Sequence, residues 1–184
     1  MSFCHHRRAF LKKSFLTSAL LLCGQPAWAG ISEPAPATDL LRLYNIHTGE
    51  KLAVDLHEIL AHKEQTGIDS LNWFLRCHYT NRVHPIDPYT LNYLDVLHQT
   101  VGGEREVHII SGYRSPEYNA LLCRESGGVA RHSLHLEGRA LDIRIPGFDL
   151  ATLRHAALSL QYGGVGYYPA SDFVHIDSGR FRQW

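Results

Sequence analysis

Apolar and polar residues alternate along two short segments of the chain, Leu40–Ile46 and Lys51–Leu56, which flank the pair Thr48-Gly49. Alternation with a period of two is typical of strands that bury one face, and a glycine-containing turn between two such strands predicts a β-hairpin. Short apolar or alternating runs predict four more strands, at residues 107–111, 139–145, 163–168 and 173–177. Most of the predicted strands therefore lie in the second half of the chain.

Four other segments have apolar residues at the spacing of a helix face. The predicted helices begin at Asp69 or Ser70, at Asp87-Pro88, at Ser115-Pro116 and at Leu150. Proline at the first helical position, after a side chain that can cap the helix, marks the second and third of these starts. Helices come early and short antiparallel strands come late. We therefore expect an α+β fold, with a small antiparallel sheet and helices on one side of it.

The composition suits one compact domain, because the chain has 184 residues and 45% of them are hydrophobic. Four of its 18 basic residues fall within the first 29 positions, which hold no acid, so 14 basic residues face 18 acids in the remainder. A mildly acidic body argues against nucleic acid as a partner. The chain also has no lysine-rich patch suited to a membrane surface. We expect a monomer.

The first 29 residues have the pattern of an export signal. Arg7-Arg8, followed by Ala-Phe-Leu-Lys, is similar to the twin-arginine signal, and the apolar run Phe15–Cys23 is too short to span a bilayer as a mature helix. Ala27-Trp28-Ala29 completes an Ala-x-Ala cleavage pattern. We expect a signal peptide at 1–29, a flexible lead at 30–39, and a periplasmic domain at 40–184 without stable membrane insertion.

Two alternatives to a cleaved signal stay open. The apolar run could remain as an uncleaved anchor, although it is short and a cleavage pattern follows it. Cys23 could carry a lipid, although Leu22 before it is larger than lipoprotein signals use. After cleavage Cys77 and Cys123 would be the remaining cysteines, and an oxidising compartment permits a disulfide between them.

Three residues in the second half of the chain could hold a metal ion. His135 on a predicted loop is followed seven residues later by Asp142 inside a strand, and Gly138 lets the chain turn between them. Asp142 lies on the polar face of that strand, where a carboxylate must be solvated, paired or bound to metal. His175 on a later strand could face the same cleft. Catalytic zinc commonly has three protein ligands and an open position for water, whereas a histidine–aspartate hydrogen bond in a polar cleft is the alternative.

The residues around this trio form a longer pattern. Ser133 to Asp142 reads Ser-x-His-x-x-Gly-x-Ala-x-Asp, and Ser111 to Ser115 reads Ser-Gly-Tyr-Arg-Ser. Further matching elements are residues 45–50, Gly163–Pro169 and Phe173–Gly179. In these motifs the chain resembles the lysostaphin, D-Ala-D-Ala peptidase and hedgehog group of zinc proteins, and within that group the murein endopeptidases. The resemblance covers most of residues 40–184 and implies a single zinc peptidase domain with a hedgehog/DD-peptidase-like fold.

The resemblance implies a role for each matched residue. One zinc ion would be bound by His135, Asp142 and His175. Arg114 would lie close by and stabilise the oxyanion that forms at the attacked amide, because a guanidinium stays charged; its alternative is a structural salt bridge. Ser133 would contact the substrate or orient its loop. Tyr168 could line the substrate groove or belong to an aromatic core.

The general base is less clear from the sequence. Some members of the group have a glutamate three residues before the last histidine ligand, and Asp172 occupies that position here, one methylene shorter. Others have a histidine two residues before it, where this chain has Phe173. Asp177 is the rival candidate, and its alternative role is to support His175. We favour Asp172 slightly, with His132 as a further candidate.

The resemblance implies a zinc amidase that acts on peptidoglycan stem peptides. Cleavage of cross-links is favoured over removal of a terminal D-alanine, and the bond expected is the one between two diaminopimelate residues. A zinc-containing, non-catalytic peptidoglycan-binding module is the alternative, and a purely structural periplasmic domain is a third. The glycines at 163, 164 and 166 lack the helix and the Lys-Ser/Thr of a phosphate loop, so we expect them to allow close backbone packing beneath the cleft.

Overall fold

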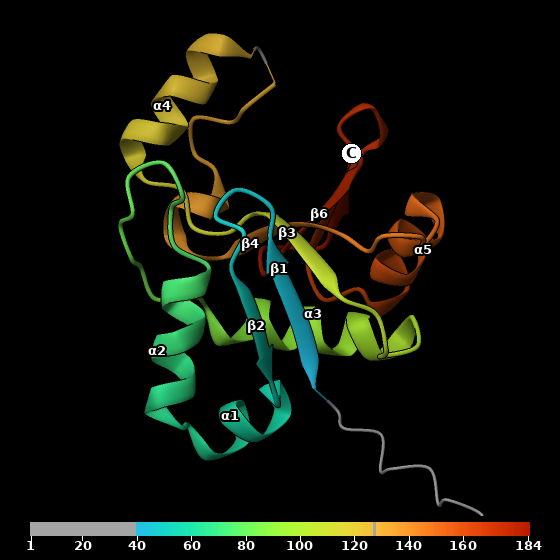
Figure 1. Cartoon of the computed structure of the whole chain (residues 1–184). Coiled ribbons are helices and arrows are strands. Elements are labelled where there is room, and N and C mark those ends of the chain that lie inside the picture. The colour runs from blue at the N-terminus through green and yellow to red at the C-terminus, as the bar shows by residue number, and fades with distance from the viewer. Residues whose placement is uncertain (1–39, 127) are drawn as a thin grey trace, which may run out of the picture. The chain divides into compact units, whose positions relative to one another are not determined.

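The computed structural model describes residues 40–126 and 128–184, and a seven-stranded sheet runs through this part of the chain (Figure 1). Its strands are β1 (Leu41–Asn45), β2 (Lys51–Val54), β3 (Val107–Ser111), β4 (Ala140–Arg144), β5 (Gly164–Tyr168), β6 (Phe173–Asp177) and β7 (Arg182–Gln183). They lie in the order β2-β1-β3-β4-β6-β5-β7. This order places β4 in the middle of the sheet with β6 beside it.

The predicted α+β class is confirmed, but the sheet is larger than expected and is mixed. Strands β1–β2, β3–β4, β4–β6 and β5–β6 pair antiparallel, as the hairpin and meander patterns predict. Strands β1 and β3 are parallel, because the chain returns from β2 through three helices before it enters β3. The short strand β7, which the sequence pattern did not predict, adds to β5 in parallel.

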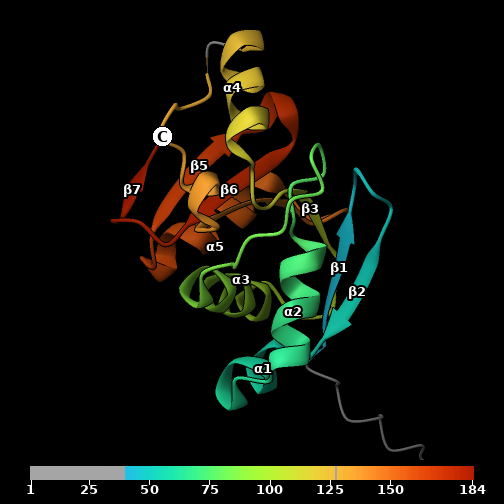
Figure 2. The same cartoon turned by 90° about the vertical axis from the view of Figure 1, so that its left-hand side faces the viewer.

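Five helices accompany the sheet in the described part of the chain (Figures 1 and 2). They are α1 (Leu56–His62), α2 (Gln65–Phe74), α3 (Pro88–Thr100), α4 (Pro116–Glu125) and α5 (Leu150–Leu160), with short 3-10 turns η1 (Leu134–Glu137) and η2 (Pro169–Ser171). Helices α3 and α5 pack against β6, and α1 packs against α3. Helix α4 stands at the end of the sheet that lies away from α1 (Figure 2).

The core lies between α3, α5 and the sheet. Helix α3 buries Leu91, Leu94 and Leu97, each at most 2% exposed. The same core contains equally buried apolar residues of β4 and β6, namely Leu141, Ile143, Val174 and Ile176. A fully buried leucine of this kind contributes roughly 1.5–3 kcal/mol to folding. The central strands are therefore fixed on this face, which leaves their other face free to carry polar side chains.

Two helix boundaries differ from the sequence prediction. Strand β2 ends at Val54, and Asp55 then caps α1 by accepting a hydrogen bond from the backbone N–H of Glu58. Helix α2 begins at Gln65 instead of beside Asp69, and its N-cap residue, Glu64, makes no side-chain capping bond. The apolar side chains of α1 were too few for a periodic pattern, so the strand prediction ran on through its first residue.

The predicted helix starts at Asp87-Pro88 and Ser115-Pro116 are confirmed, because each cap side chain accepts a backbone N–H bond inside its helix.

Cys77 and Cys123 are free thiols, so the disulfide that the sequence permitted is not formed. The predicted signal peptide at 1–29 and lead at 30–39 lie outside the described residues.

Candidate metal centre

Three elements bring the predicted ligands together. Asp142 on β4 and His175 on β6 are register partners in an antiparallel pair, so their side chains leave the sheet side by side. His135 lies on η1, which Ser133 caps by accepting a hydrogen bond from the backbone N–H of His135 at 3.4 Å. Gly138 ends η1 with φ of 65°, a left-handed conformation that favours glycine and turns the chain into β4.

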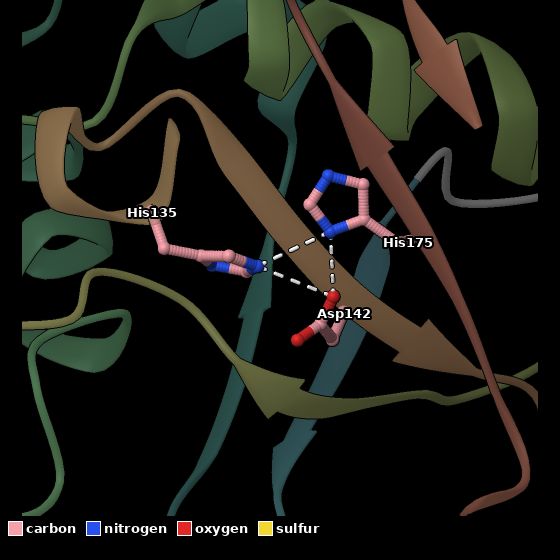
Figure 3. Close-up of side chains that lie close together, drawn as sticks. All are labelled: His135, Asp142 and His175. Atoms are coloured by element: carbon pink, nitrogen blue, oxygen red, sulfur yellow. Dashed lines mark hydrogen bonds and ion pairs between the residues drawn. The ribbon is translucent and has the colours of Figure 1, made fainter. Parts of the chain in front are cut away.

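The ligand atoms of the three residues point toward one another (Figure 3). One atom from each of His135, Asp142 and His175 lies within 4.8 Å of the others. Asp142 Oδ1 is 2.8 Å from His175 Nδ1 and 3.2 Å from His135 Nε2, and the two histidine nitrogens are 3.2 Å apart. All three residues are buried, at 7% exposure or less.

Each of the two histidines has one ring nitrogen that faces the centre and one that faces away from it. The hydrogen bond made by the nitrogen that faces away decides whether the nitrogen that faces the centre carries a lone pair. His135 Nδ1 lies 2.7 Å from the carbonyl oxygen of Gly112, which can only accept, so this nitrogen donates. His175 Nε2 lies 3.0 Å from Asp177 Oδ2 and donates for the same reason. In neutral rings His135 Nε2 and His175 Nδ1 are therefore both acceptors, and both face the Asp142 carboxylate. Three acceptor atoms in one buried spot repel unless a proton or a metal cation lies among them, so the donor set fits a metal ion.

The ionisation of these groups agrees with a cation site. Burial lowers the pKa of His135 more than the neighbouring Asp142 raises it, so this ring is kept neutral. Burial alone would raise the pKa of Asp142, but the two histidines hold it well below its usual range. Burial also tends to lower the pKa of His175, but the hydrogen bonds to Asp142 and Asp177 have the larger effect, so the pKa of His175 is raised. The centre therefore holds an ionised Asp142 beside a neutral His135, and His175 keeps a proton to higher pH than a free histidine does, a proton that a bound metal ion would replace.

Asp177 lies behind His175, and its side chain is completely buried. Its Oδ2 accepts from His175 Nε2 and from Arg182 Nη2, the latter at 2.7 Å. Its Oδ1 accepts from Arg182 Nη1 and from the backbone N–H groups of Gly164 and Gly179. Burial raises the pKa of Asp177, but these bonds and the ion pair lower it far more, so the carboxylate stays ionised. Its geometry is that of a side chain which orients His175.

Asp172 is not brought to the metal centre. It ends η2 in the left-handed conformation with φ of 53°, and its exposed carboxylate pairs with Arg144 at 3.2 Å. It does not line the cavity beside the three predicted ligands. Its position in the sequence matched a base in related proteins, but the turn at η2 directs its side chain toward Arg144.

Arg114 contacts the centre directly. Its Nη2 donates to Asp142 Oδ2, and its Nε donates to Ser111 Oγ at 2.9 Å. The backbone N–H of Arg114 also donates to the carbonyl oxygen of His135 at 3.0 Å. The guanidinium thus holds the carboxylate oxygen that faces away from the histidines, and it lines the adjoining cavity.

A cavity of about 330 Å³ opens beside the three predicted ligands. The predicted substrate contacts Ser133 and Tyr168 both line it, as does His132. The sequence prediction did not single out Arg182 or Val129, which also contribute to its walls. Trp184 closes one side, and its indole N–H donates to the hydroxyl of Tyr168 at 2.7 Å. An extended peptide segment could reach the ligands through this opening.

Comparison with known proteins identifies the family. A family model described as peptidoglycan L,D-endopeptidase MepK matches residues 33–184. The chain belongs to the MepK family. The peptidoglycan L,D-endopeptidase MepK of Escherichia coli K12 is 38% identical to it over 179 residues, which cover 97% of each chain. The probable peptidoglycan L,D-endopeptidase MepK of Haemophilus influenzae is 34% identical over 180 residues, which cover 97% of this chain and 95% of the relative.

Membership of the MepK family places the chain among the peptidases and confirms the resemblance found in its motifs. The His-Asp-His cluster is the group in the described part of the chain that could hold a metal ion. No helix among residues 40–126 and 128–184 is long and apolar enough to cross a membrane.

The glycines of β5 explain how this MepK-family chain accommodates Asp177. A Cβ atom on Gly164 would lie 2.4 Å from Asp177 Oδ2 and 2.5 Å from Arg182 Nη1. We expect Gly164→Ala to lower the free energy of unfolding by about 1–3 kcal/mol, because the buried ion pair must shift. Thermal unfolding measures this. Gly128→Ala is the control, since its Cβ would meet nothing within 4 Å. Equal melting temperatures for the two variants would contradict the expectation.

Proposed function

We propose that the chain is a zinc-dependent murein endopeptidase that hydrolyses amide bonds in the peptide cross-links of peptidoglycan. The observation that carries the proposal is the meeting of three acceptor atoms, from His135, Asp142 and His175, at the edge of an open cavity. The relatives that cover nearly the whole chain are named for the same activity. Arg114, which is held beside the ligands and lines the cavity, favours an enzyme over a binding module, because a fixed guanidinium can stabilise the oxyanion of an attacked amide.

We assign the cross-link between two diaminopimelate residues as the bond that is cut. In that cross-link the amide joins a centre of L configuration to one of D configuration. The relatives are named L,D-endopeptidases, and this bond is the cross-link that fits such a name. Trimming of a terminal D-alanine, which joins two D centres, does not fit it.

His135, Asp142 and His175 are the residues that would hold the zinc ion. A zinc ion in such a site supplies a Lewis acid for the amide carbonyl and a water whose pKa is lowered to about 7. Asp177 keeps His175 in the tautomer that turns Nδ1 toward the centre. Arg114 holds Asp142 and presents its remaining N–H groups to the cavity, where the oxyanion of the attacked amide would form.

The proton-transfer group is best assigned to His132. Every oxygen of Asp177 already accepts two or more hydrogen bonds, and Asp172 pairs with Arg144 outside the cavity. His132 is the histidine on the cavity wall that is not needed as a ligand. Histidine as a residue type is well suited to proton transfer near neutral pH.

The variant His132→Ala should lower kcat by about a hundredfold and leave zinc content unchanged, because a general base contributes roughly 10²–10⁴ to the rate. Asp172→Asn is the matched comparison and should change kcat less than about twofold, since its carboxylate serves an exposed ion pair. Steady-state hydrolysis of a cross-linked peptide measures both. The reverse result, with Asp172→Asn inactive and His132→Ala active, would assign the base to Asp172.

Defined muropeptides test the proposed bond. We expect purified protein with zinc to split dimers joined through two diaminopimelate residues, and mass analysis should find the two monomers. It should leave intact both dimers joined through D-alanine and pentapeptides that end in two D-alanines. Chelation should stop the reaction, and added zinc should restore it. Release of free D-alanine from the pentapeptide would establish the carboxypeptidase alternative and overturn the proposal.

We further propose that residues 1–29 are a twin-arginine signal peptide, that 30–39 form a flexible lead and that 40–184 are a single periplasmic zinc peptidase domain that acts as a monomer. The support is the Arg7-Arg8 pair, the Ala-x-Ala pattern ending at Ala29, and a family match that begins at residue 33. Peptidoglycan as the substrate is consistent with this location. Mass measurement of the mature protein from a periplasmic fraction would test the cleavage site.

A further inference from the structure

The turn between β1 and β2 is held by several side-chain hydrogen bonds, more than a surface turn requires. Asn45 is buried, and its side-chain oxygen accepts from the backbone N–H groups of His47 and Thr48 at 3.0 and 3.2 Å. Glu50 pairs with Arg76 through two hydrogen bonds of 2.9 and 3.1 Å, and it also accepts from Thr48 Oγ1. Its pKa is lowered, chiefly by the bond from Arg76. The effect of these bonds is to hold the exposed ring of His47 in place.

His47 begins a continuous row of four aromatic rings, which we call the aromatic row and which consists of His47, His78, Tyr118 and Tyr79. His47 stacks on His78 with ring centres 3.7 Å apart and planes inclined by 13°. His78 meets Tyr118 edge to face at 4.9 Å, and Tyr118 stacks on Tyr79 at 5.1 Å. The rings come from the β1–β2 turn, the segment after α2 and the start of α4, which lie beside one another at the lower end of α4 in Figure 1.

The middle of the aromatic row is uncharged at neutral pH. Burial, followed by the charges of His47 and Arg114, lowers the pKa of His78 to about 4. Burial raises the pKa of Tyr118, so its phenol also stays protonated. The two middle rings are therefore uncharged, and the open ring surface lies at the exposed ends of the row, His47 and Tyr79, because stacking covers the faces between the rings.

The aromatic row also has ring nitrogens and hydroxyl groups that could bond a ligand. In the described part of the chain, the ring nitrogens of His78 and the hydroxyls of Tyr79 and Tyr118 have no protein partner within hydrogen-bond distance. Tyr79 is 59% exposed, and His47 is exposed as well. His47 Nε2 is bonded to the carbonyl oxygen of Ile110, so the neutral groups that can donate to and accept from a ligand are those of the other three rings.

Arg114 connects the row to the metal centre. Its charge acts on both His78 and Tyr118, while its guanidinium bonds Asp142 and lines the cavity. His47 Nε2 donates to the carbonyl oxygen of Ile110, close to the end of β3, where Ser111 binds Arg114. A ligand on the row would thus lie next to the residue that faces the attacked amide.

We propose that the aromatic row binds the glycan strand of peptidoglycan while the cross-link lies over the metal centre, a proposal that rests on the proposed function. Sugar rings place their C–H faces on aromatic rings, whose π faces carry negative charge, and their hydroxyl and N-acetyl groups need uncharged donors and acceptors. Stem peptides carry carboxylates and amino groups, which need charged partners. The rings of the row have the first set of properties, and the charged Arg114 beside them is held by Asp142 and Ser111, so the glycan is the ligand that fits the rings.

The test compares one cross-linked dimer in two forms, with its disaccharides and after their enzymatic removal. Tyr79→Ala should raise KM about five- to tenfold for the sugar-bearing dimer, the size of one lost stacking contact, and leave the sugar-free dimer and kcat unchanged. Tyr89→Ala is the control, because this tyrosine is 78% exposed on α3 and belongs to neither the row nor the cavity.

A second measurement is independent of turnover. Peptide-free glycan oligomers should bind wild-type zinc-loaded protein and perturb the ring signals of Tyr79 and Tyr118 in NMR spectra, and Tyr79→Ala should weaken that binding. Equal effects of Tyr79→Ala on both dimers, or unchanged glycan binding, would overturn the row as a glycan site. If the wild-type protein cut neither dimer, the proposed function would be wrong. The binding measurement would still show whether the aromatic row binds glycan.

Discussion

Replacing His135 with alanine is expected to abolish both zinc binding and peptidoglycan hydrolysis. The ring supplies one of three converging acceptor atoms, and its Nε2 lies 3.2 Å from both Asp142 Oδ1 and His175 Nδ1. Without it the two remaining side chains offer too few ligands for a catalytic zinc ion. We expect the bound zinc to fall from about one ion per chain to almost none, and hydrolysis to fall about a thousandfold or more. Elemental analysis and muropeptide release measure the two effects.

The matched control is His62→Ala, which removes an exposed histidine at the end of α1. It should leave zinc content and activity unchanged. Circular dichroism shows whether either variant has lost its fold. If folded His135→Ala retained full hydrolysis in the presence of a chelator, the metal centre would not be the site of reaction.

Arg114→Ala should lower kcat by about 10²–10³, because it removes the fixed positive charge beside the attacked amide. Its Nη2 and Nε hold Asp142 and Ser111, so the position of the guanidinium is set before substrate arrives. KM should change much less, because the charge matters most as the oxyanion forms. Zinc content should persist, since the three ligand side chains remain. Steady-state kinetics on the diaminopimelate-linked dimer give kcat and KM separately.

Arg114→Lys distinguishes this role from a structural salt bridge. A lysine keeps the charge but cannot hold two partners with a planar fork, so we expect an intermediate loss of kcat. Arg144→Ala, which removes an arginine on the same side of the centre, should have no effect, because its partner Asp172 lies outside the cavity. If Arg114→Ala reduced only stability and left kcat intact, the residue would serve as a salt bridge.

The sequence singled out the trio through its motifs, and local rules placed each residue on its own element. Alternation assigned Asp142 and His175 to one face of their strands, and Gly138 marked the turn before β4. The pairing of β4 with β6, which brings the two side chains together, was only a possibility in the sequence. The glycines at 163, 164 and 166 were predicted to allow close backbone packing, and a Cβ on Gly163, directly before β5, would lie 1.7 Å from the carbonyl oxygen of Asp177.

What the sequence could not predict depends on contacts between distant segments. Alternation put Asp177 on the ligand face, but it could not show that Arg182 and two backbone N–H groups would occupy all of its oxygens. Asp172 matched a position in related proteins, yet the turn at η2 pairs it with Arg144. Helix α1 was missed because its seven residues are too short for a periodic signal.

The two histidines of the centre are 40 residues apart in the chain. A cation bound by both histidines would cross-link η1 to β6. Like a disulfide, it would close the loop of chain that lies between the two residues. Because the ligands also come from β4, the ion can be captured only after β4 and β6 have paired. Loading with metal would therefore require that the middle of the sheet has been assembled, so a chain that misfolds there would remain an inactive hydrolase.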